Sequence, residues 1–144
     1  MRSAAVAWLL DLYGFKVCQL IGGYKAYRNW VLQQFEKQYS LKVIGGYTGS
    51  GKTEILKELL KQNHTVIDLE GLASHKGSAF GAIGQEKQPS QEMFENKLAN
   101  KLFSIPAHTE IWMEDESQRI GTVMLPTPFF KQLRSSKTYF LKIP

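Results

Sequence analysis

The sequence predicts an α/β fold, and two features of the 144-residue chain support that prediction. Short runs of β-branched and apolar residues alternate with longer segments whose apolar side chains recur at helical spacing. A glycine-rich stretch joins one such run directly to a helical segment, as in proteins built from parallel strands and crossover helices. Because 43% of the residues are hydrophobic and 22% are charged, the chain can bury a core, and wholesale disorder is excluded.

The N-terminal segment predicts an apolar helix. Ser3 can cap a helix over residues 4–12, which Gly14 then ends. Because nearly all of its residues are apolar, this helix is expected to be buried. If the chain lacks the elements that cover it, the same helix is expected to expose an apolar surface.

A short strand and a second helix are expected next. Residues 16–21 predict a strand, with Cys18 as a small buried side chain rather than a nucleophile. Residues 24–38 return to helical spacing, with aromatic and aliphatic side chains on one side. The polar end of this helix predicts a linker, which divides the chain into two parts, residues 1–38 and 40–144.

The second part alternates strands and helices. A short strand is expected at residues 41–44, and buried parallel strands are expected at residues 65–69 and 111–113. Helices are expected over residues 52–61 and 90–103, the latter capped by Ser90. The intervening residues 71–90 predict a long loop, and loops of this length are usually functional or mobile.

Charge and cysteine content limit the classes of function. Lys and Arg number 18 against 13 Asp and Glu, a net charge of +5 that suits a polyanionic partner without requiring one. No acid follows Glu116, and the C-terminal segment can contact nucleic acid or form a solvated face through Lys131, Arg134, Lys137 and Lys142.

The single cysteine excludes intramolecular disulfides and predicts a reducing compartment, the cytoplasm. No apolar run is long enough to span a bilayer, so no membrane role is expected.

Residues 46–53 carry the strongest functional motif. Their sequence, GYTGSGKT, matches G-x-x-x-x-G-K-[ST] and lies between a predicted strand and a predicted helix. In such a loop, backbone N–H groups turn toward phosphate oxygens, Lys52 supplies a positive charge, and Thr53 offers a hydroxyl to Mg²⁺. The predicted phosphate-binding residues are Gly46, Gly49, Ser50, Gly51, Lys52 and Thr53.

Acidic residues that could complete a metal site with Thr53 follow the predicted strands. Mg²⁺ at a phosphate-binding loop is usually held by a carboxylate at the end of a neighbouring strand. Glu114 and Asp115 are the candidates, although a solvated acidic turn has the same sequence pattern. Asp68 and Glu70 follow another strand, where they could take the metal role, face the substrate, or order the loop as a helix cap.

Three further polar residues are candidates to contact an anion. His75, Lys76 and Arg119 lie in or after loops at strand ends. The alternative is that they are simply solvated loop residues.

Several sequence strings resemble the bacterial tRNA 2-selenouridine synthase family. They are VIDLEGLA (66–73), HKGS (75–78), FG (80–81), QPSQ (88–91), FEN (94–96), WMEDES (112–117) and RIG (119–121). The resemblance is dense across residues 41–134. Residues 20–24 with Trp30 resemble the end of a rhodanese domain, and residues 1–3 resemble the tail of its active-site loop, C-x-x-G-G-x-R-S.

The resemblance implies a specific domain arrangement. The chain would comprise the C-terminal tail of a rhodanese domain followed by the first part of a P-loop NTPase-like domain with a parallel sheet. The family's nucleophilic cysteine would precede Met1, and Cys18 does not match it. The chain is therefore expected to be a fragment truncated at both ends, with no catalytic residue of its own and no activity alone.

The resemblance also implies a transferase reaction on tRNA. In this family, the wobble-position 2-thiouridine is alkylated from geranyl diphosphate, and selenium from selenophosphate then displaces the S-geranyl group. Mg²⁺ and ATP or GTP are further candidate ligands of the loop. His75, Lys76 and Arg119 match family positions, which favours them as ligand or tRNA contacts.

Two alternative functions, each of a different class, stay open. A P-loop small-molecule kinase or NTPase predicts Mg²⁺-dependent phosphate transfer or hydrolysis that is independent of tRNA. A catalytically inactive phosphate- or tRNA-binding remnant predicts salt-dependent binding without turnover.

Overall fold

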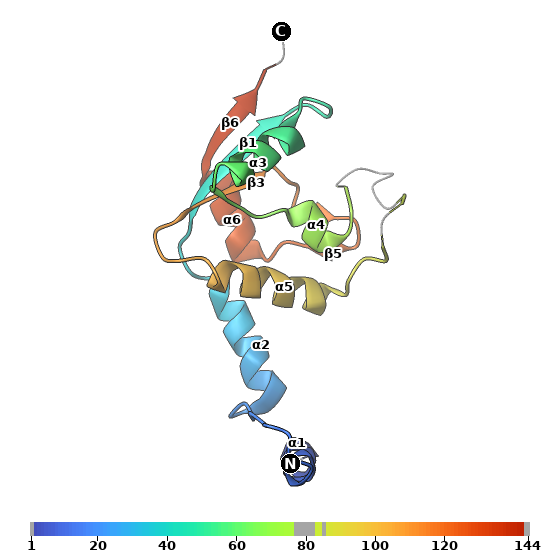
Figure 1. Cartoon of the computed structure of the whole chain (residues 1–144). Helices are drawn as coiled ribbons and strands as arrows, with labels where there is room; N and C mark the ends of the chain where they lie inside the picture. Colours follow the sequence, from blue (N-terminus) through green and yellow to red (C-terminus); the bar gives the residue numbers. More distant parts are fainter. Residues whose placement is uncertain (1, 77–82, 85, 143–144) are drawn as a thin grey trace.

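The computed structural model of this chain describes residues 2–76, 83–84 and 86–142, and it confirms the mixed α/β class. A parallel sheet has the strand order β2-β3-β1-β6, and β4 and β5 form a separate antiparallel pair (Figure 1). The strands are β1 Ser40–Gly46, β2 Thr65–Val66, β3 Glu110–Glu114, β4 Arg119–Ile120, β5 Val123–Met124 and β6 Lys137–Leu141. The helices are α1 Arg2–Leu12, α2 Gly23–Gln34, α3 Lys52–Lys61, α4 Leu69–Ala73, α5 Gln91–Phe103 and α6 Thr127–Ser135. None of these described helices is long and apolar enough to cross a membrane.

Strand β1 lies at the centre of the sheet. It pairs in parallel with β3, in a register that runs from Ser40 opposite Glu110 to Ile44 opposite Glu114. Its other edge pairs in parallel with β6, and β2 pairs with the outer edge of β3. Because parallel strands all end at the same edge, the glycine-rich loop after β1 lies beside the acidic segment after β3.

Side chains of β1 alternate between the two faces of the sheet, as the period of a strand requires. Leu41 and Val43 enter the main core, whereas Ile44 is buried outside it, as is Leu56 of α3. The main core also includes Val31, Phe35, Phe94, Leu98, Leu102, Ile111, Met113, Phe129 and Leu133. Figure 1 shows α3 on one side of the sheet and α6 on the other, so both faces of the central strands are covered.

Several predicted elements are confirmed with small changes of boundary. The strands at 41–44 and 111–113 are present as parts of β1 and β3, and α3 has the predicted bounds. Helix α5 begins after Ser90, whose Oγ accepts a hydrogen bond of 3.1 Å from the Met93 N–H. The predicted helix over 24–38 ends earlier, at Gln34.

The third predicted strand, residues 65–69, is shorter than expected. Only Thr65 and Val66 pair with β3, because the Asp68 side chain accepts a hydrogen bond of 2.9 Å from the Gly71 N–H and starts α4. This short helix occupies the beginning of the predicted loop over 71–90. Residues 77–82 and 85 of that loop lie outside the described residues.

The predicted strand at residues 16–21 is wrong, and so is the burial of Cys18. Among the described residues no strand pairs with this segment, so its backbone has no ladder to join, and Cys18 is exposed. Helix α1 forms as predicted but is not buried: Trp8 is 65% exposed, and α1 lies far from the sheet, beyond the start of α2 (Figure 1). The alternative expectation of an exposed apolar surface on this helix is confirmed.

Helix α2 packs against α5. Arg28 forms an ion pair with Glu95 and donates a hydrogen bond of 2.6 Å to Asn96 Oδ1. Val31 and, just after the helix, Phe35 are buried in the main core. Helix α2 thus shares a core with the sheet that follows it, and the division of the chain into two domains stays a prediction.

No helix or strand is predicted from the sequence after residue 113, so β4, β5, α6 and β6 were missed. Helix α6 carries Pro128 in its first turn, a common helix-start signal, and buries Phe129 and Leu133 at four-residue spacing. Strand β6 is an edge strand whose Tyr139 and Phe140 are exposed. Its aromatic and β-branched residues favour a strand, but the pairing with β1 depends on residues almost a hundred positions earlier.

We expect Leu98→Ala to lower the free energy of unfolding by about 2–5 kcal/mol, because Leu98 is completely buried and its removal leaves a cavity. The matched control is Leu60→Ala, since Leu60 also lies on a helix but is 59% exposed. Its effect should stay within about 0.5 kcal/mol. Chemical denaturation monitored by circular dichroism measures both, and equal effects of the two substitutions would contradict the core described here.

Candidate functional site

The glycine-rich loop, residues 46–53, makes a tight turn between β1 and α3. Gly51 immediately precedes α3 with a φ of 83°, in the left-handed region that favours glycine. At Gly46 a Cβ would lie 2.6 Å from Ser50 Oγ, so a side chain there would collide with the loop. The turn thus presents the N-terminus of α3, where unpaired backbone N–H groups favour an anion.

The Lys52 ammonium folds back across the loop. Its Nζ donates hydrogen bonds to the carbonyl oxygens of Gly46, at 3.0 Å, and of Tyr47, at 3.1 Å. An ammonium group has three N–H donors, so one remains for a ligand. The two carbonyls therefore hold a positive charge at the loop before any phosphate arrives.

The structure brings Thr53 and Glu114 together. Thr53 Oγ1, on the first turn of α3, donates a hydrogen bond of 2.8 Å to Glu114 Oε1 at the end of β3. A hydroxyl from the loop helix and a carboxylate from the neighbouring strand form the pair that P-loop proteins use to hold Mg²⁺.

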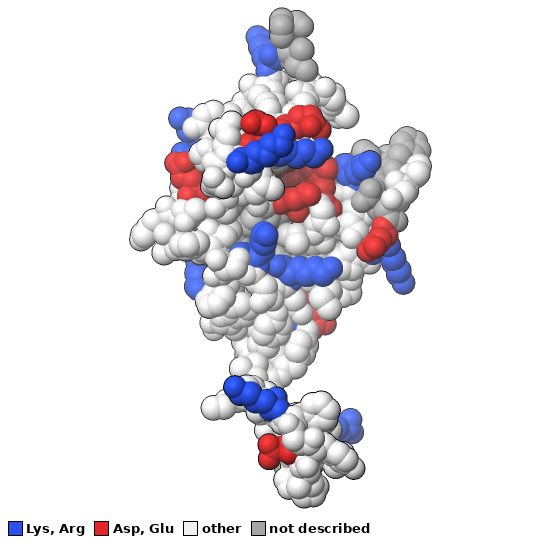
Figure 2. All heavy atoms as spheres, viewed as in Figure 1, with Lys and Arg blue, Asp and Glu red and all other residues white. Residues whose placement is uncertain are grey.

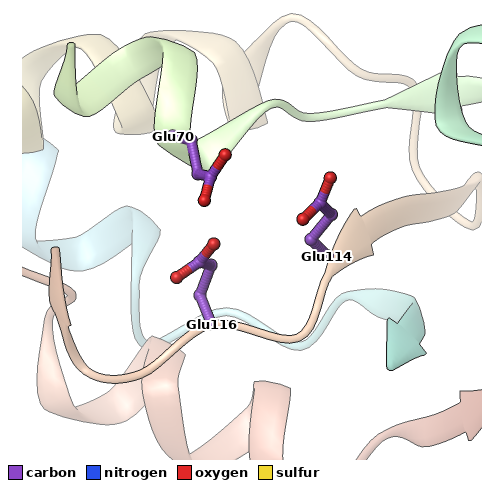
Figure 3. A group of neighbouring side chains, drawn as sticks. All are labelled: Glu70, Glu114 and Glu116. Carbon is purple, nitrogen blue, oxygen red and sulfur yellow. The ribbon is translucent and has the colours of Figure 1, made fainter. Parts of the chain in front are cut away.

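Glu70 and Glu116 join Glu114 in a carboxylate cluster. One oxygen of each of the three side chains lies within 4.8 Å of the others (Figure 3). Glu70 comes from α4, Glu114 from β3 and Glu116 from the segment after β3. Figure 2 shows acidic side chains gathered between α3 and α4. Carboxylate and hydroxyl oxygens are hard ligands of the kind that Mg²⁺ prefers.

The cluster retains a proton at neutral pH. Burial raises the pKa of Glu116 to about 8, and its hydrogen bond to Glu70 and the neighbouring negative charges add to the effect. Burial also raises the pKa of Glu70, which accepts the hydrogen bond from Glu116. The protonated Glu116 reduces the repulsion among the three carboxyl groups.

Asp68 and Asp115, the other acidic candidates, have different partners. Asp115 Oδ1 accepts a hydrogen bond of 2.8 Å from Arg134 Nη1 of α6. Asp68 caps α4 as described above, which was one of the roles considered for it. Neither belongs to the carboxylate cluster, and the metal role of Asp115 stays a prediction.

His75, Lys76 and Arg119 lie around the β4–β5 pair and the end of α4, outside the carboxylate cluster. His75 is buried, and a Cβ on Gly121 would lie 2.7 Å from its Cδ2. Lys76 and Arg119 are exposed, and Arg119 Nη2 lies 3.8 Å from Met124 Sδ. Their role as substrate or tRNA contacts stays a prediction.

Glu116 is not among the site residues predicted from the sequence. Its 8% exposed fraction and its contact with Glu70 depend on how the chain turns after β3. Only its position in the acidic run 114–116 could have drawn attention to it.

Two glutamines that attach the β4–β5 pair to the helices were also missed. Gln88 Nε2 donates to the carbonyl oxygens of Ala73, at 2.9 Å, and Ile120, at 3.1 Å. Gln91 exchanges two hydrogen bonds of 2.7 Å with the backbone of Met124. Both glutamines belong to the string QPSQ, so the resemblance was the one available signal.

Comparisons with known proteins all point to one family. A family model described as the tRNA 2-selenouridine synthase AAA domain matches residues 39–144. The chain is 39% identical over 143 residues to a protein named tRNA 2-selenouridine synthase from Nitrosomonas eutropha, covering 95% of this chain and 36% of that protein. A protein of the same name from a Sulfurovum species is 41% identical over 145 residues, covering 97% and 38% respectively.

A third similar protein, from Hydrogenovibrio crunogenus, also has this name and is 39% identical over 155 residues, which cover 100% of this chain and 41% of that protein. The chain thus spans about two fifths of the length of the curated relatives it matches. No solved structure matches it.

Stability should fall as the pH rises through the cluster's titration. The folded protein keeps Glu116 protonated up to a pKa of about 8, whereas an unfolded glutamate loses its proton near 4.5. Between these values the folded state binds more protons, so the free energy of unfolding decreases with increasing pH. Glu116→Gln cannot lose a proton, and its melting temperature should therefore decline less between pH 5 and pH 8 than that of the wild type.

The control for this measurement is Glu36→Gln, which changes an exposed glutamate. It should retain the wild-type pH dependence of the melting temperature. A wild-type pH dependence in Glu116→Gln would show that the buried carboxyl group is not responsible.

Proposed function

The chain belongs to the tRNA 2-selenouridine synthase family through its AAA domain, and from this premise we propose that residues 46–53 bind the diphosphate of a small-molecule substrate in selenium transfer to tRNA. The observation that carries the proposal is the 2.8 Å hydrogen bond between Thr53 and Glu114. It places a hydroxyl and a carboxylate beside a loop that already holds the Lys52 ammonium. These groups are the ones that a bound diphosphate and its metal ion require.

In the proposed complex, the loop binds phosphate oxygens with two kinds of donor. Backbone N–H groups at the start of α3 point toward the anion, and the dipole of the helix adds a partial positive charge. The third N–H of Lys52 contributes a charge-assisted hydrogen bond. Because loops of this sequence bind phosphate groups in general, ATP or GTP is the alternative occupant.

A Mg²⁺ ion fits the oxygen donors beside the loop. Thr53 Oγ1 and the carboxylate of Glu114 are the first candidates to hold it, and the oxygens of Glu70 and Glu116 lie close to Glu114. Asp115 would have to give up its ion pair with Arg134 to take part. When bound, the ion would neutralise charge on the diphosphate.

The proposed reaction of the whole enzyme begins with alkylation of tRNA. The sulfur of 2-thiouridine attacks C1 of geranyl diphosphate, a C–S bond forms, and the C–O bond breaks with its electron pair on the departing diphosphate. The loop amides and Lys52 would stabilise that leaving group. Selenium of selenophosphate would then attack C2 of the modified uridine, a C–Se bond would form, and the C–S bond would break with geranylthiol leaving. Attack of water on phosphorus would break the P–Se bond and release phosphate.

His75, Lys76 and Arg119, which were predicted to contact an anion, are proposed to act in the same reaction. The exposed Lys76 and Arg119 are accessible to tRNA or substrate. His75 is buried beside the β4–β5 turn, so it would act mainly by positioning that turn.

A P-loop kinase or NTPase is the second candidate, because it would use the same pair of Thr53 and Glu114. The two functions differ in their dependence on tRNA. Phosphate release from ATP or GTP without tRNA would favour the second candidate, whereas consumption of geranyl diphosphate only with thiolated tRNA supports the first.

Lys52→Ala should weaken the binding of geranyl diphosphate to this chain by about ten- to a hundredfold, since hydrogen bonds to charged groups contribute about 1.5–3 kcal/mol. Isothermal titration calorimetry measures the change. Lys57→Ala is the matched control, because Lys57 is an exposed lysine of the same helix that pairs with Glu54. Its affinity should equal that of the wild type.

Enzymatic activity provides a second, independent test of the role of Lys52. In a full-length member of the family that contains the sequence GSGKT, replacing the lysine of that sequence by alanine should slow the geranylation of thiolated tRNA. Unchanged affinity together with unchanged geranylation would exclude the proposed role of the loop.

Thr53→Val should remove the part of diphosphate affinity that depends on Mg²⁺, because valine keeps the shape of threonine but has no hydroxyl. Thr53→Ser keeps the hydroxyl and should retain that dependence. Titrations with and without Mg²⁺ separate the two variants. Equal Mg²⁺ dependence in both would show that Thr53 does not hold the ion.

A further inference from the structure

A row of aromatic rings follows the contact between α2 and α5. The ring centroids of Tyr24 and Tyr27 lie 5.8 Å apart, those of Tyr27 and Trp30 5.7 Å, and those of Trp30 and Phe103 5.1 Å. Packing within the row holds the rings in place. The side chain at each end is open to solvent, with Tyr24 57% and Phe103 62% exposed.

Three hollows in the described part of the chain open along this row. One of about 360 Å³ is lined by rings of the row and by Asn100. A second, of about 570 Å³, shares Tyr27 and Asn100 with it and continues along α5. A third, of about 550 Å³, shares Phe103 with the first and reaches the N-terminal ends of β1 and β3. We call this surface the α2–α5 groove, with Tyr27, Trp30, Lys37, Lys97, Lys101 and Phe103 as its main residues.

The α2–α5 groove is positively charged. Its lining contains Lys37, Lys97 and Lys101 and, among the described residues, no aspartate or glutamate. None of these lysines forms an ion pair within the described part of the chain. Lys37 Nζ lies 5.9 Å from the centroid of the Phe103 ring and donates to Gln34 Oε1 at 2.8 Å.

The nearest acids on α5 do not offset this charge. Glu92 and Glu95, at the other end of the helix, both pair with Arg28. Figure 2 shows basic side chains over α5, separate from the acidic patch between α3 and α4. The groove therefore offers flat apolar surface next to unneutralised positive charge.

We propose that the α2–α5 groove binds unpaired nucleotides of an RNA strand. Phosphates would lie beside Lys97 and Lys101, and a base would stack on Phe103, with Lys37 released to a neighbouring phosphate. Aromatic rings beside lysines are the chemistry by which proteins bind single-stranded nucleic acid. The choice of RNA rests on the proposed function, the action on tRNA.

An apolar protein segment is a poorer occupant of the groove. It would cover the rings but would also remove three lysines from water without giving them an anionic partner, which is costly. RNA supplies both the stacking surface and the phosphates. Because the groove reaches the N-terminal edge of the sheet, whereas residues 46–53 follow the C-terminal end of β1, RNA and diphosphate would not compete.

The test is the binding of a fluorescein-labelled single-stranded RNA of about 12 nucleotides, within the range of known single-strand sites. Fluorescence anisotropy with the 144-residue chain is measured between about 50 and 200 mM salt, where counterion release is evident. The double variant Lys97→Ala/Lys101→Ala should bind more weakly. Its slope of log affinity against log salt should be smaller by about 1.4, because each phosphate contact on a single strand contributes about 0.7.

Lys57→Ala/Lys61→Ala is the matched control. It also removes two lysines four residues apart on one helix, but these lysines pair with Glu54 and Glu58 on α3. It should bind RNA with the wild-type affinity and salt slope. An equal loss in both double variants would mean that net charge alone attracts RNA, and the proposed groove would be wrong.

Stacking is tested separately with Phe103→Ala, which should weaken binding about tenfold without changing the salt slope, since stacking on an aromatic ring contributes about 1–3 kcal/mol per base. Phe103→Tyr keeps the ring and should bind like the wild type. Because Phe103 is largely exposed, neither change should impair folding, and circular dichroism checks this. No loss in Phe103→Ala, or equal affinity for a duplex RNA, would overturn the proposal.

The test also distinguishes this inference from the proposed function. Lys52→Ala should lose affinity for geranyl diphosphate but bind the RNA normally. Loss of RNA binding in Lys52→Ala would contradict two separate sites. Wild-type RNA binding in the Lys97/Lys101 variant would overturn the groove and leave the diphosphate site unaffected.

Discussion

The parallel pairing of β1 with β3 is the constraint on which the candidate site depends. It sets Ile44 opposite Glu114, and a hydrogen bond of 2.9 Å from the Asp115 N–H to the Ile44 carbonyl continues the ladder past the end of β3. The same register carries the chain after β1 into the glycine-rich loop and places Thr53 next to Glu114. If the register between β1 and β3 slipped by one residue, each side chain of β3 would move to the opposite face of the sheet. Glu114 would then point away from the loop.

Carboxyl groups that repel one another lie beside a positively charged lysine at this edge of the sheet. Three carboxyl groups lie together beside a loop whose Lys52 is already hydrogen-bonded to two carbonyls. A proton retained by Glu116 lowers the repulsion, and a divalent cation between diphosphate and carboxylates would lower it further. Toward the opposite, N-terminal edge of the sheet, the α2–α5 groove has positive charge without acids in its lining. The chain thus separates its acidic surface from its basic aromatic surface.

Elements whose determinants are local could be predicted from the sequence. Helices α3 and α5 have their apolar spacing, and in α5 also the cap, within one short segment. The segment over 16–21 has the composition of a strand, but a strand forms only with a partner, and none is present among the described residues. The same dependence on a distant partner explains why β6 was missed.

The glycine-rich motif that predicts phosphate binding could be recognised from the sequence alone, because the glycines, Lys52 and Thr53 all lie within eight consecutive residues, 46–53. From the sequence, either Glu114 or Asp115 could lie beside Thr53. Neighbouring side chains on a strand point to opposite faces, so Glu114 meets Thr53 of α3, whereas Asp115 meets Arg134 of α6. That choice, and the burial of Glu116 against Glu70, depends on contacts between segments tens of residues apart, which exist only once the sheet has formed.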